Sequence, residues 1–149
     1  MTKLNLGCGR SPLTGFINCD ANEKASYDKF LNVTTGLPWP DGSVEQVHCG
    51  NLFDSLTRDE FNSLMREIWR VLETGGTLTF EQMDVTKNFD MGIGWPYFVT
   101  PVTRYLFNYY EVGNDAYENW KEIYSLPGFV QVDIAHNPNG VMIGSMTKP

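Results

Sequence analysis

The segment LNLGCGRSPLTGFINCD, residues 4–20, places two short apolar stretches too close together for a full helix to fit between them. The first stretch ends in a glycine turn at Gly7 and Gly9, and the second ends at Asp20. The connection at 10–15 holds a proline and a glycine, and it is shorter than the roughly three turns of an average helix. We therefore expect two neighbouring strands joined by a crossing of at most one helical turn.

A glycine turn followed by an acid is typical of nucleotide-like cofactor sites, and the length of the crossing limits which cofactor fits. In the dinucleotide pattern the acid follows about 20 residues after the glycines, whereas Gly9 and Asp20 are only 11 positions apart. Pyrophosphate is bound at a helix N-terminus, and Pro12 stands where that pattern has its third glycine. The segment therefore favours a ligand with a nucleoside and no pyrophosphate, with Asp20 accepting hydrogen bonds from the ribose hydroxyls.

The rest of the chain alternates further strand patterns with one strongly amphipathic helix. Thr57 and Glu60 form a capping box ahead of a helix over 57–72, whose apolar residues recur every three or four positions. Gly75 and Gly76 are expected to end that helix and turn the chain. Further strands are expected at 29–33, 44–49 and 77–83, a second helix at 115–126, and a β-hairpin at 129–136 and 141–147. This order predicts an α/β domain over residues 1–149, with a mostly parallel sheet and an antiparallel hairpin at its C-terminal end.

Composition excludes several classes of protein and site. The net charge of −7, with scattered Lys and Arg, argues against a nucleic-acid partner. No apolar run approaches the roughly 20 residues of a membrane span, so we expect no membrane partner and a cytoplasmic location. The three cysteines form no C-x-x-C pair, which favours free thiols over a disulfide framework or a zinc site, and no metal ligands are predicted.

Four blocks in order resemble the class I S-adenosylmethionine-dependent methyltransferases: LNLGCG, GFINCD, GLPWPDGSVEQVHCGNLFDSL and EIWRVLETGGTLTF. The resemblance spans residues 3 to about 83. It implies a Rossmann-like, three-layer sandwich with a shortened first crossing, and S-adenosylmethionine as cofactor.

The resemblance also implies a set of cofactor-binding residues at the strand ends: Asn5, Gly7, Cys8, Gly9, Asp20, Ala21, Asn32, Val33, Gly50, Asn51 and Leu52. In this set the glycine turn contacts the methionine part, Asp20 holds the ribose and Ala21 lies beside the adenine. Asn32 takes the place of an aspartate that contacts the adenine amino group. The amide oxygen of Asn32 could still accept a hydrogen bond from that amino group. Asn5 stands where many members of the family have an acid.

Methyl transfer to a hydroxyl or amine is helped by a general base. Four ionisable residues near the strand ends are candidates: His48, Asp54, Glu81 and Asp84. Of these, Asp54 and Glu81 are favoured. His48 lies inside an expected strand, where packing is the more common role. Cys8 is not favoured as a nucleophile because no neighbouring base in the sequence would activate it.

Residues 84–127 form an aromatic insert that none of the four blocks covers. We expect it to close the substrate pocket, or to form a subunit interface in a homodimer, while core packing is an equal alternative for any single ring. Trp120 and Tyr124, spaced i, i+4, have the spacing of a packing face.

These observations predict a methyltransferase that acts on a small molecule with S-adenosylmethionine as methyl donor. The alternative is a non-catalytic or partner-dependent subunit of the same fold. An NAD-dependent oxidoreductase is less favoured, because the helix and the third glycine are missing.

Overall fold

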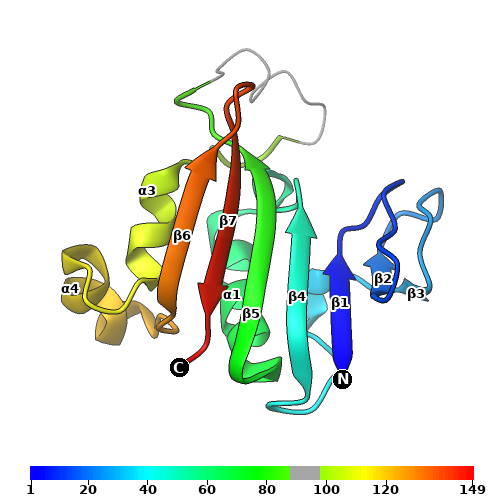
Figure 1. Cartoon of the computed structure of the whole chain (residues 1–149), viewed down its shortest axis with the longest axis horizontal. Coiled ribbons are helices and arrows are strands. Elements are labelled where there is room, and N and C mark those ends of the chain that lie inside the picture. The colour runs from blue at the N-terminus through cyan, green and yellow to red at the C-terminus, as the bar shows by residue number, and fades with distance from the viewer. Residues whose placement is uncertain (88–97) are drawn as a thin grey trace.

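The computed structural model describes residues 1–87 and 98–149, which build one sheet of seven strands in the order β3-β2-β1-β4-β5-β7-β6 (Figure 1). The strands are β1 (Thr2–Leu6), β2 (Ile17–Asp20), β3 (Lys29–Phe30), β4 (Val44–Gly50), β5 (Leu72–Met83), β6 (Val130–His136) and β7 (Val141–Thr147). The helical elements are η1 (Val33–Thr35), η2 (Phe53–Ser55), α1 (Arg58–Val71), α3 (Arg104–Phe107), η3 (Asn108–Tyr110) and α4 (Asp115–Tyr124).

Strand pairing confirms the predicted mixed sheet. The strands β1 to β5 pair in parallel, whereas β7 runs antiparallel to both β5 and β6. The Asn-Pro-Asn-Gly segment at 137–140 closes the β6–β7 hairpin, where Asn137 Oδ1 accepts from the backbone N–H groups of Asn139 and Val141. The C-terminal hairpin is therefore part of the main sheet.

Helix α1 begins as the sequence predicts. The Thr57 hydroxyl accepts from the Glu60 backbone N–H, and the Glu60 carboxylate accepts from the Thr57 backbone N–H at 2.8 Å. The prediction that Gly75 and Gly76 end the helix is wrong. The helix ends at Val71, and both glycines lie within β5, whose pairing with β4 is irregular there. Gly76 is needed because a Cβ would lie 2.9 Å from the Glu73 carbonyl oxygen.

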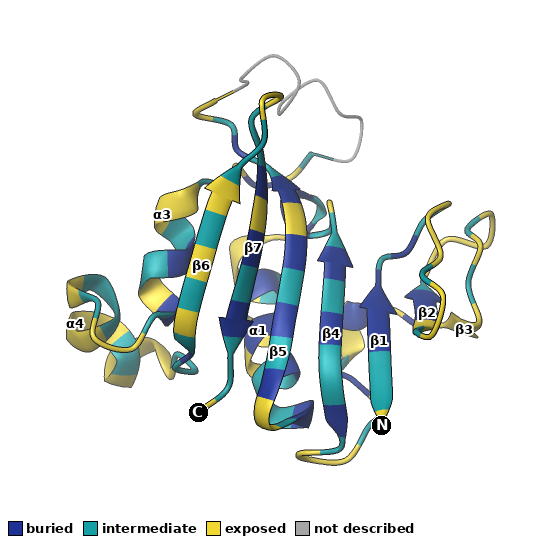
Figure 2. Cartoon of the chain, in the orientation of Figure 1, coloured by how far each residue is buried: buried dark blue, intermediate teal, exposed yellow. Residues whose placement is uncertain are grey.

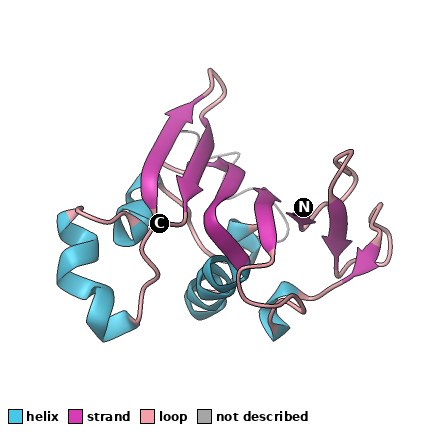
Figure 3. Ribbon diagram, turned by 60° about the horizontal axis from the view of Figure 1, so that its bottom comes forward, coloured by secondary structure: helices cyan, strands magenta, loops and turns pink. Residues whose placement is uncertain are grey.

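The described helices all lie on one face of the sheet (Figure 3), so the described residues form two layers and not the three expected. Connections between parallel strands of one sheet are right-handed. The connections from β1 to β2 and from β2 to β3 therefore lie on one face, and the connections that lead to β4, β5 and β6 lie on the other. The first two connections, 7–16 and 21–28, contain no helix. The face that they would cover therefore lacks a helical layer.

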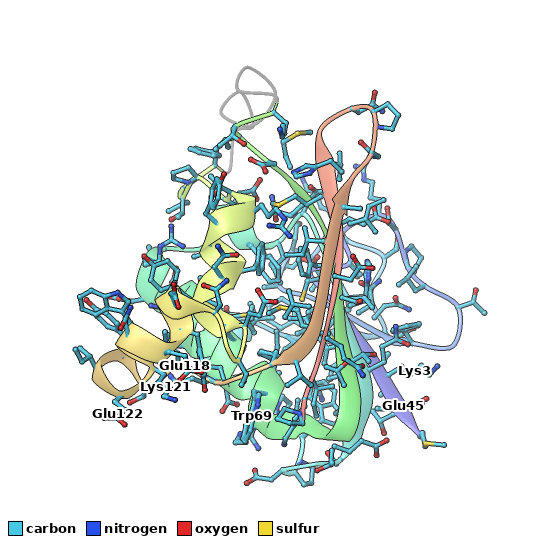
Figure 4. All side chains as sticks on the ribbon, turned by 60° about the vertical axis from the view of Figure 1, so that its left-hand side comes forward. Lys3, Glu45, Trp69, Glu118, Lys121 and Glu122 are labelled. Carbon is cyan, nitrogen blue, oxygen red and sulfur yellow. The ribbon has the colours of Figure 1, made fainter. Side chains whose placement is uncertain are left out.

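The strands show an alternation that suits this one-sided arrangement. On β5, Leu78 and Phe80 are buried toward the helices, whereas Thr79 is partly exposed and Glu81 exposed on the other face (Figure 2). A polar row crosses that face in register: Asn18, Asn5, His48, Thr79, Ser145 and Asp133. Figure 4 shows Lys3 and Glu45 on this uncovered side and Glu118 and Lys121 on the helical side. Parallel strands covered on both faces would instead be apolar throughout.

Asn18 organises the two helix-free crossings. Its side-chain oxygen accepts from the Asn5 amide at 2.9 Å and from the Leu13 backbone N–H at 2.7 Å. Its side-chain nitrogen donates to the Asp28 carboxylate at 2.8 Å, which the Asn18 backbone N–H also contacts at 2.8 Å. These bonds from Asn18 lower the pKa of Asp28. One buried amide thus joins β1, β2 and both connections.

The second half of the aromatic insert contributes to the core. Phe107 and Tyr110 are buried, and the Phe107 ring stacks on Phe80 with ring centres 4.4 Å apart. In contrast, α4 has no buried residue (Figure 2). The prediction that Trp120 and Tyr124 form a packing face is wrong, because they are 42% and 54% exposed.

We expect Asn18→Ala to lower the free energy of unfolding by about 2–4 kcal/mol, because the Asn5 amide and the Leu13 N–H lose their acceptor inside the fold. Urea denaturation followed by tryptophan fluorescence measures the loss. Asn139→Ala, on the hairpin tip, is the matched control and should change the value by less than about 0.5 kcal/mol. Equal stability of the two variants would contradict the role given to Asn18.

Candidate functional site

A cavity of about 1040 Å³ opens at the carboxyl ends of β1 to β4. This is where parallel α/β sheets bind ligands, and the volume is large enough for a drug-sized molecule. Seven of the eleven residues that the resemblance implies line it: Gly7, Asp20, Ala21, Asn32, Val33, Asn51 and Leu52. The fold therefore brings segments from four strand ends around one space.

Asp20 fixes the glycine turn from the end of β2. One carboxylate oxygen accepts from the Gly9 backbone N–H at 2.8 Å, and the other accepts from the Asn22 backbone N–H at 2.7 Å. A carboxylate offers about four acceptor positions, so two remain for a ligand. Gly9 does not line the cavity, but it holds the carboxylate that does.

The turn after β1 and the bend after β4 meet at Gly7 and Leu52. Gly7 has φ +66°, and a Cβ there would lie 2.8 Å from the Leu52 Cδ1 atom. The bend itself depends on Asn51, which adopts φ +49° while its backbone N–H donates to the Glu81 carbonyl at 2.7 Å. A non-glycine residue in this conformation is uncommon, and asparagine adopts it more often than most residues.

Three of the implied cofactor residues lie outside the cavity lining besides Gly9. The Asn5 amide donates to Asn18 and to the Ser11 carbonyl, so Asn5 supports the crossing from the uncovered face. Gly50 precedes the bend, where its position beside His48 leaves no contact with the cavity. Burial, with the nearby Asp20 and Asp28 carboxylates, raises the pKa of the Cys8 thiol, which makes it a poor nucleophile.

Neither favoured general base lines the cavity. Glu81 is exposed on the uncovered face of β5, together with His48, whose Nδ1 lies 3.0 Å from the Thr79 hydroxyl. Burial lowers the pKa of His48. Asp84 is buried at the top of β5, where its carboxylate lies 2.8 Å from His136 Nε2.

Asp54 lies behind the cavity wall, in η2. Its side chain is buried, and its Oδ1 and the Gln82 Nε2 lack a hydrogen-bond partner among the described residues. Burial is the largest influence on the Asp54 carboxyl, and it raises the pKa of Asp54. Asp54 is thus a buried carboxyl outside the cavity lining.

The cavity also has a cover that the four sequence blocks did not indicate. Phe98 and Val99 line it, and the Val99 and Thr100 backbone N–H groups donate to the Asp54 carbonyl at 2.7 and 3.1 Å. The only signal for this cover was the aromatic insert 84–127, whose segment 88–97 lies outside the described residues. Ser55 and Leu56 also line the cavity.

The comparisons with known proteins agree with this geometry. Residues 18–80 match the family described as "Methyltransferase domain". No curated protein matches the chain.

Solved structures share the fold over nearly the whole chain at low identity. A methyltransferase dependent on S-adenosylmethionine (SAM) from Archaeoglobus fulgidus has a TM-score of 0.73 at 14% identity, covering 99% of this chain and 86% of that one. One from Aquifex aeolicus has a TM-score of 0.62 at 14% identity, covering 100% and 82%. A chain of the complex between the Haloferax volcanii Trm112 methyltransferase activator and a methyltransferase has a TM-score of 0.65 at 14% identity, covering 99% and 82%.

The fold is Rossmann-like, with a cavity at the carboxyl ends of the first four strands. The family match and the shared fold together confirm the resemblance to class I S-adenosylmethionine-dependent methyltransferases. S-adenosylmethionine is the cofactor that this family implies. The cavity fits that cofactor, because an acid that can take both ribose hydroxyls stands beside a glycine turn without a helix for pyrophosphate.

Within residues 1–87 and 98–149, no helix combines the length and the apolar character needed to cross a membrane.

We expect Asp54→Asn to be more stable relative to the wild type at pH 7 than at pH 4. A carboxyl whose pKa is raised on folding contributes stability at low pH. This contribution is lost as the pH rises from the pKa of the unfolded state, near 3.9, through the pKa of the folded state. Asparagine cannot ionise and so avoids this loss. Urea denaturation at both pH values measures the difference, with Asp133→Asn on the uncovered face as the control. An Asp54→Asn variant that loses more stability at pH 7 than at pH 4 would show that the fold needs the carboxylate.

Proposed function

We propose that this chain transfers a methyl group from S-adenosylmethionine to a small-molecule acceptor. The observation that carries the proposal is the cavity in which the glycine turn, Asp20, η1 and the bend after β4 meet. A ribose acid beside a glycine turn, without a pyrophosphate site, suits a cofactor that joins a nucleoside to an amino acid.

The bound cofactor would supply a methyl group activated on a sulfonium, and in-line displacement then needs mainly orientation and a dry site. Asp20 would hold the ribose with the acceptor positions that Gly9 and Asn22 leave free. Gly7 would allow the backbone to approach the methionine part closely.

The remaining wall favours a small and largely apolar acceptor. Leu52, Leu56, Phe98 and Val99 line the part of the cavity beyond the glycine turn. Val99 is 52% exposed, so the described cover leaves the cavity open to an entering molecule. Asp54, directly behind this wall, would position the cover through its carbonyl and would not itself remove a proton from the acceptor.

Asp20→Ala tests the cofactor site directly. We expect calorimetry to show micromolar binding of S-adenosylhomocysteine to the wild type and at least tenfold weaker binding to the variant, because the ribose loses its acceptor. Asp133→Ala removes the same charge from the uncovered face and should bind as the wild type does. No binding to the wild type at millimolar ligand, or unchanged binding to Asp20→Ala, would overturn the proposal.

A second candidate is a partner-dependent subunit that binds the cofactor but transfers no methyl group alone. Two observations favour it: one structural neighbour is seen with a methyltransferase activator, and α4 exposes Trp120, Ile123 and Tyr124. Under this reading the isolated chain binds S-adenosylhomocysteine yet releases none from S-adenosylmethionine with a panel of thiols, amines and phenols. Methyl transfer by the isolated chain to any of them would reject it. A homodimer through the aromatic insert and a cytoplasmic location stay predictions.

A further inference from the structure

Asn32 lies where a nucleobase would sit if the proposed function holds. It lines the same cavity as Asp20 and follows β3, in which Phe30 pairs in register with Asp20. With the amino-acid part at the glycine turn and the ribose on Asp20, the base extends toward Leu31, Asn32 and Val33. The edge of a purine that carries N1 and the substituent at position 6 projects furthest from the ribose, toward these residues.

The orientation of the Asn32 amide is fixed by its own helix. Asn32 caps η1, and its Oδ1 accepts from the Thr34 backbone N–H at 3.0 Å and from the Thr34 hydroxyl at 2.8 Å. A backbone N–H can only donate, so the oxygen and not the nitrogen must face Thr34. An amide oxygen has two lone pairs, and both are now in use.

The side-chain nitrogen is therefore the group that Asn32 can offer to a ligand, and it is a donor. This changes the expectation drawn from the sequence, in which the amide oxygen accepts a hydrogen bond from the adenine amino group. An amino group at position 6 would meet another donor, so no hydrogen bond could form between the two groups. A carbonyl oxygen at the same position would instead accept from the amide nitrogen.

We propose that Asn32 is a specificity-determining residue that reads position 6 of the purine as a hydrogen-bond donor. The site then does not select for the amino group of adenine. It accepts a 6-oxopurine nucleoside at least as well, which distinguishes this chain from a site with a carboxylate at position 32.

The test compares S-adenosylhomocysteine with its deaminated analogue, S-inosylhomocysteine, by calorimetry. We expect the wild type to bind the inosyl compound at least as tightly as the adenosyl compound. Asn32→Asp keeps one oxygen for Thr34 and turns the free position into an acceptor. This variant should shift the affinity ratio toward the adenosyl compound by at least fivefold.

Asn22→Asp is the matched control. Asn22 also lines the cavity, and its Oδ1 caps the Lys24 backbone N–H at 3.0 Å in the same way. The added charge should change both affinities alike and leave their ratio unchanged.

A wild type that prefers the adenosyl compound more than fivefold would overturn the inference, as would a smaller or opposite shift in Asn32→Asp. These outcomes leave the proposed function intact, because both compounds still bind. Failure of the wild type to bind either compound at millimolar concentration would overturn the proposed function together with this inference. The wild-type ratio needs no variant, so the test does not depend on how well Asn32→Asp folds.

Discussion

The hydrogen bonds of the buried Asn18 amide are the interaction on which the site depends. They hold two connections in place that are too short or too irregular for a helix, and thereby set the distance between the glycine turn and Asp20. A helix in the first connection would add a positive N-terminal end beside the turn and favour pyrophosphate. An asparagine holds this connection instead, so Asp20 stays beside the glycine turn and no helix N-terminus stands between β1 and β2. The network also includes Asn5, whose amide donates to the Ser11 carbonyl and to Asn18.

In the cavity wall, too, the residues that line the cavity are supported by buried residues behind them. Asp54 and Gln82 are buried behind the wall, yet the Asp54 carbonyl anchors the cover and the Gln82 oxygen accepts from the Phe53 backbone N–H at 3.1 Å. Phe53 in turn packs edge-on against Phe80, with ring centres 5.7 Å apart. The bend after β4, the cover and the aromatic core are thus joined in one packed unit. A change in the insert can reach the cavity through this unit without touching a ligand.

The sequence predicted the succession of strands along the chain, the capping box, the short first crossing and the placement of Asp20 after the second strand, because each depends on local spacing. It did not predict the missing layer, although the alternation of Val47, His48 and Cys49 already indicates one solvated face. The expectation of a third layer came from the resemblance and was at odds with that local signal. The structure also places Asn5 and Asp54 outside the cavity lining, and it turns the Asn32 amide oxygen toward Thr34. Which partner a polar side chain finds depends on backbone groups that folding brings close, and spacing along the chain does not show them.

The uncovered face has a consequence for how the strands align. A slip of one residue in any strand would exchange its polar residues with the apolar ones on the opposite face. In a sheet buried on both sides such an exchange costs little, since both faces are apolar. Here it would turn Leu6, Cys49 or Phe80 out into water and press Asn5, His48 or Thr79 against the helices. The contact of the uncovered face with water therefore disfavours misaligned pairing of β1, β4 and β5. In a three-layer protein this role falls to the packing of helices against that face.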